Sequence, residues 1–217
     1  FYLHHIKPYL KNLERLRAGT YRDSKSGLFL DRNERSVPYD SKIIEALFHH
    51  LKNVNFGLYP ELEPFYQKLS GWHGIPVNQI YITEGVSGAI KSLVETLTSP
   101  GKHNIVFPYP TFAMYPVYCK MFDVNAKTVG YNEQYNLDYS TLIKLIDDKT
   151  AIVFLPNPNM PIEGTLSIKE IVNIAQKCIK HKAIIAIDEV YYPYGGPTAI
   201  KLINEYDNIF VMRSFSK

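Results

Sequence analysis

The chain has 217 residues, which is enough for one domain with a sizeable core, or for one domain and a piece of a second. Its composition, 46% hydrophobic and 21% charged, is typical of a folded globular protein and excludes a disordered or fibrous chain. The 24 basic and 21 acidic residues give a formal net charge of +3 and form no long basic run, which argues against a nucleic-acid partner.

The cysteines and the apolar runs argue against several further classes of protein. Cys119 and Cys178 are far apart and have no zinc-ligand spacing, so the sequence predicts neither a disulfide framework nor a metal site. No segment reaches the ~18 consecutive apolar residues of a membrane span, and the first residues contain no targeting segment. We therefore expect a cytoplasmic protein without a membrane partner, whose true start lies upstream of Phe1.

The order of predicted elements indicates an α/β fold. Residues 1–35 have a polar, Arg-rich middle and are predicted to form an N-terminal arm or entry segment. From about residue 80 onward, short runs rich in Ile, Val and Phe alternate with segments of helical spacing. The predicted strands cover residues 80–83, 104–107, 124–129, 151–155, 183–188 and 209–212.

Two helices are predicted between these strands, at residues 87–99 and 167–181. The second begins with Ser167 and Glu170 in the arrangement of a capping box. Several strands lack polar alternation, which is typical of a sheet with helices on both faces. The last strand runs into Lys217 without a covering helix, so we expect the sheet to be incomplete at the C-terminus and the chain to be a fragment of a longer protein.

Loops that follow the predicted strands carry most of the chemically interesting residues. Ligands of open α/β sheets bind beyond the carboxyl ends of the strands. Residues 84–88 place small residues before a helix, where free backbone N–H groups favour a phosphate, although an ordinary N-cap at Ser87 explains them as well. The Pro-rich loop at 156–161 presents Asn157 and Asn159, and such a loop is often only a turn.

Two further loops contain charged residues at strand ends. Asp188 ends an apolar strand, where a carboxylate is costly unless it meets a cation or a hydrogen-bond donor; capping of the next turn is the alternative. Arg213, two serines and Lys217 follow the last strand, and a lone lysine there is ordinarily a solvated charge. The conjunction of the four loops, in this order, indicates a site.

Together these residues resemble the class I/II, fold type I pyridoxal-phosphate aminotransferases, and most closely the histidinol-phosphate aminotransferase group. The resemblance covers about residues 30–217. It implies a three-layer sandwich with a mostly parallel central sheet, formed by residues 36–217 as a truncated large domain without the small C-terminal domain. The matching stretches are LDRNE at 30–34, YPE at 59–61, GVS at 85–87, YPTF at 109–112, PNMP at 158–161, DEVY at 188–191 and SFSK at 214–217.

The resemblance also implies a role for each matching residue around pyridoxal 5'-phosphate. Lys217 would hold the cofactor as a Schiff base and then move a proton as a general base. Asp188 would pair with the pyridine nitrogen, and Phe112 would stack on the ring. Tyr191 and Asn159 would hydrogen-bond the ring oxygen O3′ and lower the pKa of the linkage to lysine.

The phosphate and the subunit contact are assigned in the same way. The family's phosphate cradle falls on Gly85, Val86, Ser87, Ser214 and Ser216 in this chain. Tyr59 matches a tyrosine that reaches the phosphate of the neighbouring subunit, which implies a homodimer. The asparagine loop departs from the family's Asn-Pro-Thr-Gly pattern because Met160 precedes Pro161, so either Asn157 or Asn159 could reach the ring.

Several functions are compatible with these residues. The first is transfer of an amino group from a donor such as glutamate to a small, phosphorylated carbonyl acceptor. A decarboxylase of a phosphorylated amino acid would use the same cofactor cage, since carboxylate-binding groups outside this chain select the reacting bond. A ligand-sensing domain fused to a DNA-binding segment is disfavoured because no helix-turn-helix is recognisable, and a dehydrogenase because no GxGxxG occurs.

Overall fold

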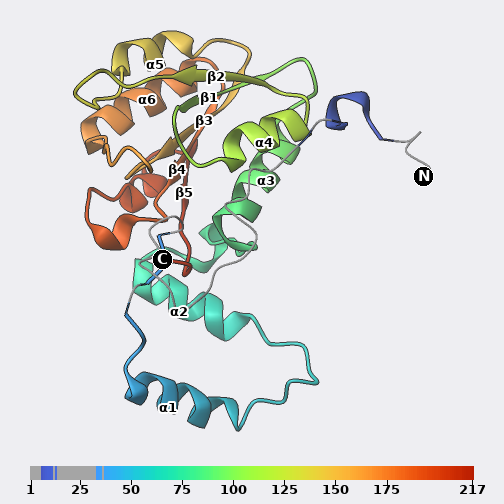
Figure 1. The fold of residues 1–217 in the computed structure, drawn as a ribbon, viewed down its shortest axis with the longest axis vertical. Helices are drawn as coiled ribbons and strands as arrows, with labels where there is room; N and C mark the ends of the chain where they lie inside the picture. Colours follow the sequence, from blue (N-terminus) through green and yellow to red (C-terminus); the bar gives the residue numbers. More distant parts are fainter. Residues whose placement is uncertain (1–5, 12, 14–32, 36) are drawn as a thin grey trace, which may run out of the picture. The chain divides into compact units, whose positions relative to one another are not determined.

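The structure is a computed structural model that describes residues 6–11, 13, 33–35 and 37–217. Most of the predicted N-terminal arm therefore lies outside the described residues, as does the start of the LDRNE stretch. The chain divides into two compact units: residues 1–17 with 83–217, and residues 18–82. The first unit contains every strand of the described chain, and its helices are α3 to α6 (Figure 1).

A five-stranded, fully parallel sheet organises the first unit. The strand order is β2-β1-β3-β4-β5, so the chain reverses its direction of travel across the sheet between β1 and β3. Five of the predicted strands are confirmed to within about one residue at each end. The strands are β1 (Asn104–Pro108), β2 (Asn125–Val129), β3 (Thr150–Pro156), β4 (Ile184–Asp188) and β5 (Ile209–Met212).

Helices cover both faces of this sheet, as Figure 1 shows for α3 and α4 (green) and for α5 and α6 (yellow to orange). Because side chains alternate along a strand, Ile105 and Phe107 pack with α3 and α4, whereas Val106 packs with α5 and α6. The predicted three-layer α/β fold is confirmed. The helices are α3 (Gly85–Leu97), α4 (Met114–Met121), α5 (Tyr139–Leu145) and α6 (Ile168–Lys180).

Local sequence accounts for where α6 begins. The Ser167 side chain accepts from the Glu170 backbone N–H, and the Glu170 carboxylate accepts from the Ser167 N–H at 2.8 Å, which is the predicted capping box. The face at Ile171, Ile174 and Cys178 is fully buried against the sheet. Short 3-10 helices, η2 (Pro8–Leu10), η4 (Tyr192–Tyr194) and η5 (Ile200–Asn204), complete this unit.

The strand predicted at residues 80–83 is wrong. Ile80 ends η3 (Val77–Gln79), and the Ile82 backbone N–H donates to the Tyr66 hydroxyl at 3.3 Å instead of to a neighbouring strand. An apolar run forms a strand only where a partner supplies the ladder of hydrogen bonds. The alternative N-cap at Ser87 is also wrong, because α3 begins at Gly85 and Ser87 lies inside its first turn.

The second unit contains α1 (Ser41–Leu51), α2 (Glu63–His73) and η3. Asp40 caps α1 by accepting from the Lys42 N–H, and α2 ends at Gly74, whose φ of 66° is readily adopted by glycine. No residue of α1 is buried, although Ile43, Leu47 and Phe48 lie on it. This unit therefore exposes a set of large apolar side chains.

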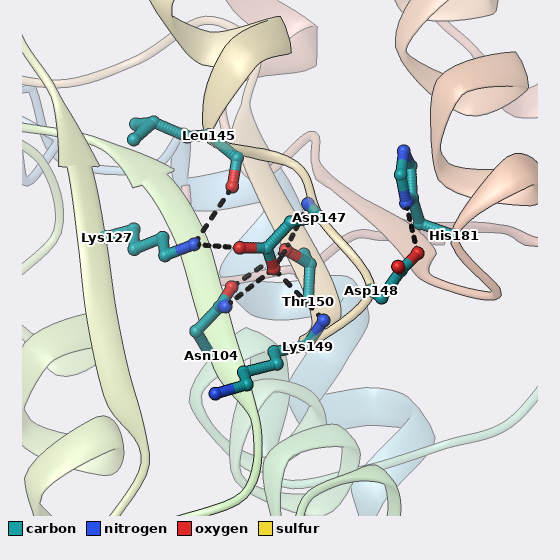
Figure 2. A network of polar contacts seen from close by, with 8 residues as sticks. All are labelled: Asn104, Lys127, Leu145, Asp147, Asp148, Lys149, Thr150 and His181. Atoms are coloured by element: carbon teal, nitrogen blue, oxygen red, sulfur yellow. Dashed lines mark hydrogen bonds and ion pairs between the residues drawn. The ribbon is translucent and has the colours of Figure 1, made fainter.

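A polar network lies at the amino ends of β1 and β3, opposite the loops that follow these strands. Figure 2 shows Asp147 between Lys127 of β2, Asn104 of β1 and Thr150 of β3. The Asp147 carboxylate accepts from Lys127 Nζ at 2.6 Å, from Asn104 Nδ2 at 3.0 Å and from Thr150 Oγ1 at 3.2 Å. The network ties three strands to the segment after α5.

Both cysteines of the chain are buried. Cys119 and Cys178 are free thiols, as predicted, and burial raises the pKa of each to about 12. Within the described residues, no helix is both long enough and apolar enough to cross a membrane.

Candidate functional site

The strand order indicates at which edge of the sheet a ligand is expected to bind. In doubly wound sheets, ligands bind outside the carboxyl ends of the strands where the chain reverses direction, here between β1 and β3. The register aligns Pro156, Asp188 and Met212 on β3, β4 and β5. Three of the four loops that were predicted to carry the site therefore begin side by side at the same edge, whereas the loop at 84–88 follows no strand.

Asp188 is the most unusual group at this edge, since its side chain is 2% exposed. Its carboxylate accepts from the Tyr115 hydroxyl at 2.8 Å and from the Val190 backbone N–H at 3.1 Å. Among the described residues, no Lys, Arg or His forms an ion pair with it. Burial raises the pKa of Asp188 to about 6, against the lowering effect of the two hydrogen bonds.

Tyr115, which sequence reasoning missed, connects this carboxylate to the YPTF segment at 109–112, here called the aromatic loop. Its ring packs with Phe107 and Phe154 of the sheet, and Phe112 meets it edge-on with centroids 6.2 Å apart. Burial and the neighbouring Asp188 raise the pKa of Tyr115 well above its ordinary value, so it remains a hydrogen-bond donor. Nothing local in the sequence marks this tyrosine, because its partner is 73 residues away.

Two of the segments that were predicted to hold a phosphate lie next to each other in the structure. Gly85 begins α3 with φ of 67°, and a Cβ atom placed on it would lie 3.7 Å from Ser214 Oγ. Ser214 Oγ in turn accepts from the Ser216 N–H at 3.1 Å. The first turn of α3, which includes Val86 and Ser87, and the serine loop after β5 are thus neighbours, although 129 positions separate Gly85 from Ser214 in the sequence.

Both asparagines of the loop after β3 are buried. Asn157 connects the start of this loop with its end and with β4: its Oδ1 accepts from the Leu166 N–H at 2.8 Å, and its backbone N–H donates to the Asp188 carbonyl at 2.9 Å. Asn159 instead contacts residues that follow β1 and β2, with Thr111 Oγ1 donating to its Oδ1 at 2.7 Å. The two amides therefore face different surroundings.

A buried ion pair connects the loop after β4 with the end of β5. Glu189 is fully buried, and Arg213 donates to its Oε2 from Nε at 3.0 Å and from Nη2 at 2.8 Å. Thr198 and the Ala199 N–H also donate to this carboxylate, and the Arg213 guanidinium lies 3.8 Å from the Tyr192 ring centroid. Glu189 directly follows Asp188, and Arg213 directly precedes Ser214. The pair therefore holds these two parts of the chain together.

The remaining predicted residues lie on these same segments or in the other unit. Tyr191 is half-buried directly before η4, and Phe112 is 41% exposed between β1 and α4. Lys217 is half-buried at the end of the segment that follows β5. Tyr59 belongs to the second unit, where it is 98% exposed.

Known proteins resemble this chain in sequence. A histidinol-phosphate aminotransferase of Thermoanaerobacter pseudethanolicus is 29% identical over 191 residues, covering 87% of this chain and 53% of the relative. Another protein of that name, from Methanocella arvoryzae, is 29% identical and is covered over 58% of its length. The chain thus spans about half the length of the curated relatives it matches.

Solved structures show the same fold. The histidinol-phosphate aminotransferase of Sinorhizobium meliloti, in complex with pyridoxal-5'-phosphate, superposes with a TM-score of 0.74 at 20% identity, over 86% of this chain and 51% of that one. Cystalysin from Treponema denticola, which contains the same cofactor, gives a TM-score of 0.74 at 19% identity over 83% of this chain and 50% of that one. The family model described as aminotransferase class I and II matches residues 28–217, and the chain belongs to this family.

Proposed function

We propose that the full-length protein is a pyridoxal-phosphate-dependent aminotransferase. It would move an amino group from an amino acid donor, glutamate, to a small phosphorylated carbonyl acceptor. Membership of the aminotransferase family supports the reaction class, and the relatives named for histidinol phosphate support the phosphorylated acceptor. The observation that carries the proposal is the buried carboxylate of Asp188, which the described residues leave without a cationic partner.

The residues present fit the cofactor. A protonated pyridine nitrogen would supply the positive charge that Asp188 lacks, and a cation there would bring the pKa of this carboxyl back down. The N-terminus of α3 and the hydroxyls of Ser214 and Ser216 offer donors to a phosphate. Phe112 presents an exposed ring that could cover the cofactor face.

Bound pyridoxal phosphate would supply an electron sink for the bond broken at the substrate α-carbon. The chain supplies the other groups. Lys217 would attach the cofactor through Nζ and, once released, its amine would carry the proton at the α-carbon. Asp188 would keep the ring nitrogen protonated, and Tyr191 would donate from its hydroxyl to the ring oxygen.

Transamination is favoured over the decarboxylase considered from the sequence. The relatives reported above that match in sequence are named aminotransferases, and none of the described site residues distinguishes the two reactions. The groups that hold the substrate carboxylate select which bond is broken.

The first experiment is absorbance spectroscopy of the full-length protein loaded with pyridoxal phosphate, followed by borohydride reduction and peptide mapping. We expect a visible absorption band and a pyridoxyl label on Lys217. The exposed Lys201→Ala variant should label normally and Lys217→Ala should not label. A protein that takes up no cofactor, or that is labelled at another lysine, would overturn the proposal.

The assay that follows combines glutamate with phosphorylated carbonyl compounds and, separately, with their unphosphorylated counterparts. We expect turnover to depend on the phosphate, and release of carbon dioxide without amino transfer would instead identify a decarboxylase.

We also propose that the protein is a homodimer in which Tyr59 reaches the partner's cofactor phosphate. Tyr59 is almost completely exposed, and large apolar side chains surround it in the sequence of the second unit, including Phe56, Leu58 and Leu62. Exposed apolar sets of this size are typical of interaction surfaces.

Subunit mixing tests the shared site directly. Tyr59→Ala and Lys217→Ala subunits should each be impaired alone, and co-expressed hybrids should regain activity because one of their two sites is intact. Hybrids as inactive as the parents, with a monomeric mass by light scattering, would contradict the dimer.

A further inference from the structure

The hydrogen bonds of Asn159 define what its side chain can do. This residue lies after β3, at the edge of the sheet where the strand order reverses between β1 and β3, and is 1% exposed. Its Nδ2 donates to the Pro110 carbonyl at 3.0 Å and to the Tyr131 hydroxyl oxygen at 2.6 Å. Its Oδ1 accepts from Thr111 Oγ1 at 2.7 Å. Three partners from two other loops therefore surround one amide.

The orientation of this amide is fixed by its partners. The Pro110 carbonyl can only accept, so the Asn159 atom beside it must be the nitrogen. A carboxamide nitrogen has two N–H groups, and both are used on protein acceptors. Only acceptor capacity on Oδ1 remains, whereas a contact with the anionic ring oxygen of the cofactor requires a donor.

The same bonds hold the aromatic loop in place. Pro110 and Thr111 directly precede Phe112, the residue predicted to stack on the cofactor. Tyr131 follows β2 and belongs to the same cluster; burial raises its pKa, and the hydrogen bond from Asn159 offsets part of this rise. Asn159 thus connects the ends of β1, β2 and β3 at the reversal point of the sheet.

We propose that Asn159 is a positioning residue that holds the Phe112 loop, and that it does not donate to the cofactor. Donation to the ring oxygen then falls to Tyr191. This inference rests on the proposed function for its cofactor part, whereas the cluster of Asn159, Thr111 and Tyr131 is a property of the protein alone. The two parts can be tested separately.

The cluster is tested by chemical denaturation of the full-length, cofactor-free protein. Thr111→Val and Asn159→Ala should each lower the denaturation midpoint, and the double variant should lower it by clearly less than the sum of the two, because both remove the same bond. Thr141→Val, which changes an exposed hydroxyl in the first turn of α5, is the matched control and should add to Asn159→Ala without coupling. Additive effects of Thr111→Val and Asn159→Ala would overturn the cluster.

The cofactor part is tested by titrating the visible absorbance of the loaded protein with pH. A donor to the ring oxygen lowers the pKa of the link to Lys217, so its loss raises the absorbance midpoint. We expect Asn159→Ala, Thr111→Val and Tyr131→Phe to weaken cofactor affinity by up to about tenfold each and to leave the midpoint unchanged. Tyr191→Phe should raise the midpoint.

The pH titration and the denaturation cycle distinguish the possible roles of Asn159. A rise of the midpoint in Asn159→Ala that Thr111→Val and Tyr131→Phe do not share would show that Asn159 contacts the ring oxygen, and would overturn the proposal. If the wild-type protein takes up no cofactor, the proposed function fails, while coupling in the denaturation cycle still decides whether Asn159 holds the loop.

Discussion

Asp188 carries a charge in surroundings that disfavour it. Its carboxylate is buried, and one side-chain hydroxyl, that of Tyr115, with one backbone N–H is its whole hydrogen-bonding environment among the described residues. The Tyr115 ring in turn packs with Phe107 and Phe154. Burial raises its pKa to about 6, and the negative charge of Glu189 raises it slightly further. A buried, perturbed carboxyl at the carboxyl end of a parallel strand is typical of a functional site.

This pKa predicts how the stability of the cofactor-free protein depends on pH. The folded-state pKa, about 6, lies above the ordinary value of 3.8, so the folded state loses stability as pH rises between these values. The loss is complete above pH 6 and amounts to on the order of 3 kcal/mol. Asp188→Asn should remove this decline, so urea denaturation from pH 4 to pH 7 should give a flatter profile than the wild type. Parallel profiles would show that Asp188 ionises normally.

Stabilisation by added cofactor tests the proposed role of Asp188 in a second way. Wild-type protein should be stabilised by pyridoxal phosphate at pH 7, and Asp188→Asn should lose most of that stabilisation because the ring nitrogen no longer has an anionic partner.

The start of α6 depends on the reciprocal hydrogen bonds between Ser167 and Glu170. Ser167 and Glu170 satisfy backbone N–H groups that the first helical turn leaves without partners. We expect Ser167→Ala to lower the free energy of unfolding by about 1 kcal/mol, measured by urea denaturation. Lys169→Ala, an exposed change in the same turn, is the control and should have little effect.

The Glu189–Arg213 pair connects the loop after β4 to the end of β5, next to the serines and Lys217. Arg213→Met would leave the buried Glu189 carboxylate without its cation, and we expect a loss of about 3–5 kcal/mol. Glu189→Gln combined with Arg213→Met should recover much of that loss, since no uncompensated charge then remains. Denaturation of both variants measures the difference, and equal losses would indicate that Arg213 acts through packing on Tyr192 instead.

In the whole molecule, the carboxylates of Asp147 and Asp188 lie at opposite edges of the sheet. They have opposite effects on how the stability of the folded state changes as pH falls. Hydrogen bonds from Lys127 and Asn104 hold the pKa of Asp147 well below its ordinary value (Figure 2). Its stabilising effect is present above the ordinary carboxyl range and is lost as pH falls through the folded pKa.

The Asp147 side chain is 48% exposed, so solvent screens this contribution to about 1 kcal/mol or less. Asp147→Asn should therefore lower stability modestly at pH 7 and have no effect at very low pH, as measured by denaturation at both values. The exposed Asp207→Asn variant is the control. Asp188→Asn should show the reverse pattern: it should raise the stability at neutral pH.

Much of the fold follows from local patterns. Continuous apolar runs locate β1, β3 and β4 because these strands are buried on both faces, and the Ser167–Glu170 pair locates α6. Residues 80–83 have a similar apolar character and form no strand, since strand formation depends on a neighbour that a short sequence window does not contain.

Short motifs in the sequence were enough to pick out Asp188, Lys217, Phe112 and the serines as candidates and to predict that they lie at or after the ends of strands. What these residues and their neighbours contact depends on the tertiary structure. The bonds of Asp188 with Tyr115, of Asn159 with Thr111 and of Glu189 with Arg213 join residues 73, 48 and 24 positions apart. Strand order and register bring these partners together, and a hydrogen bond depends on distance in space rather than along the chain.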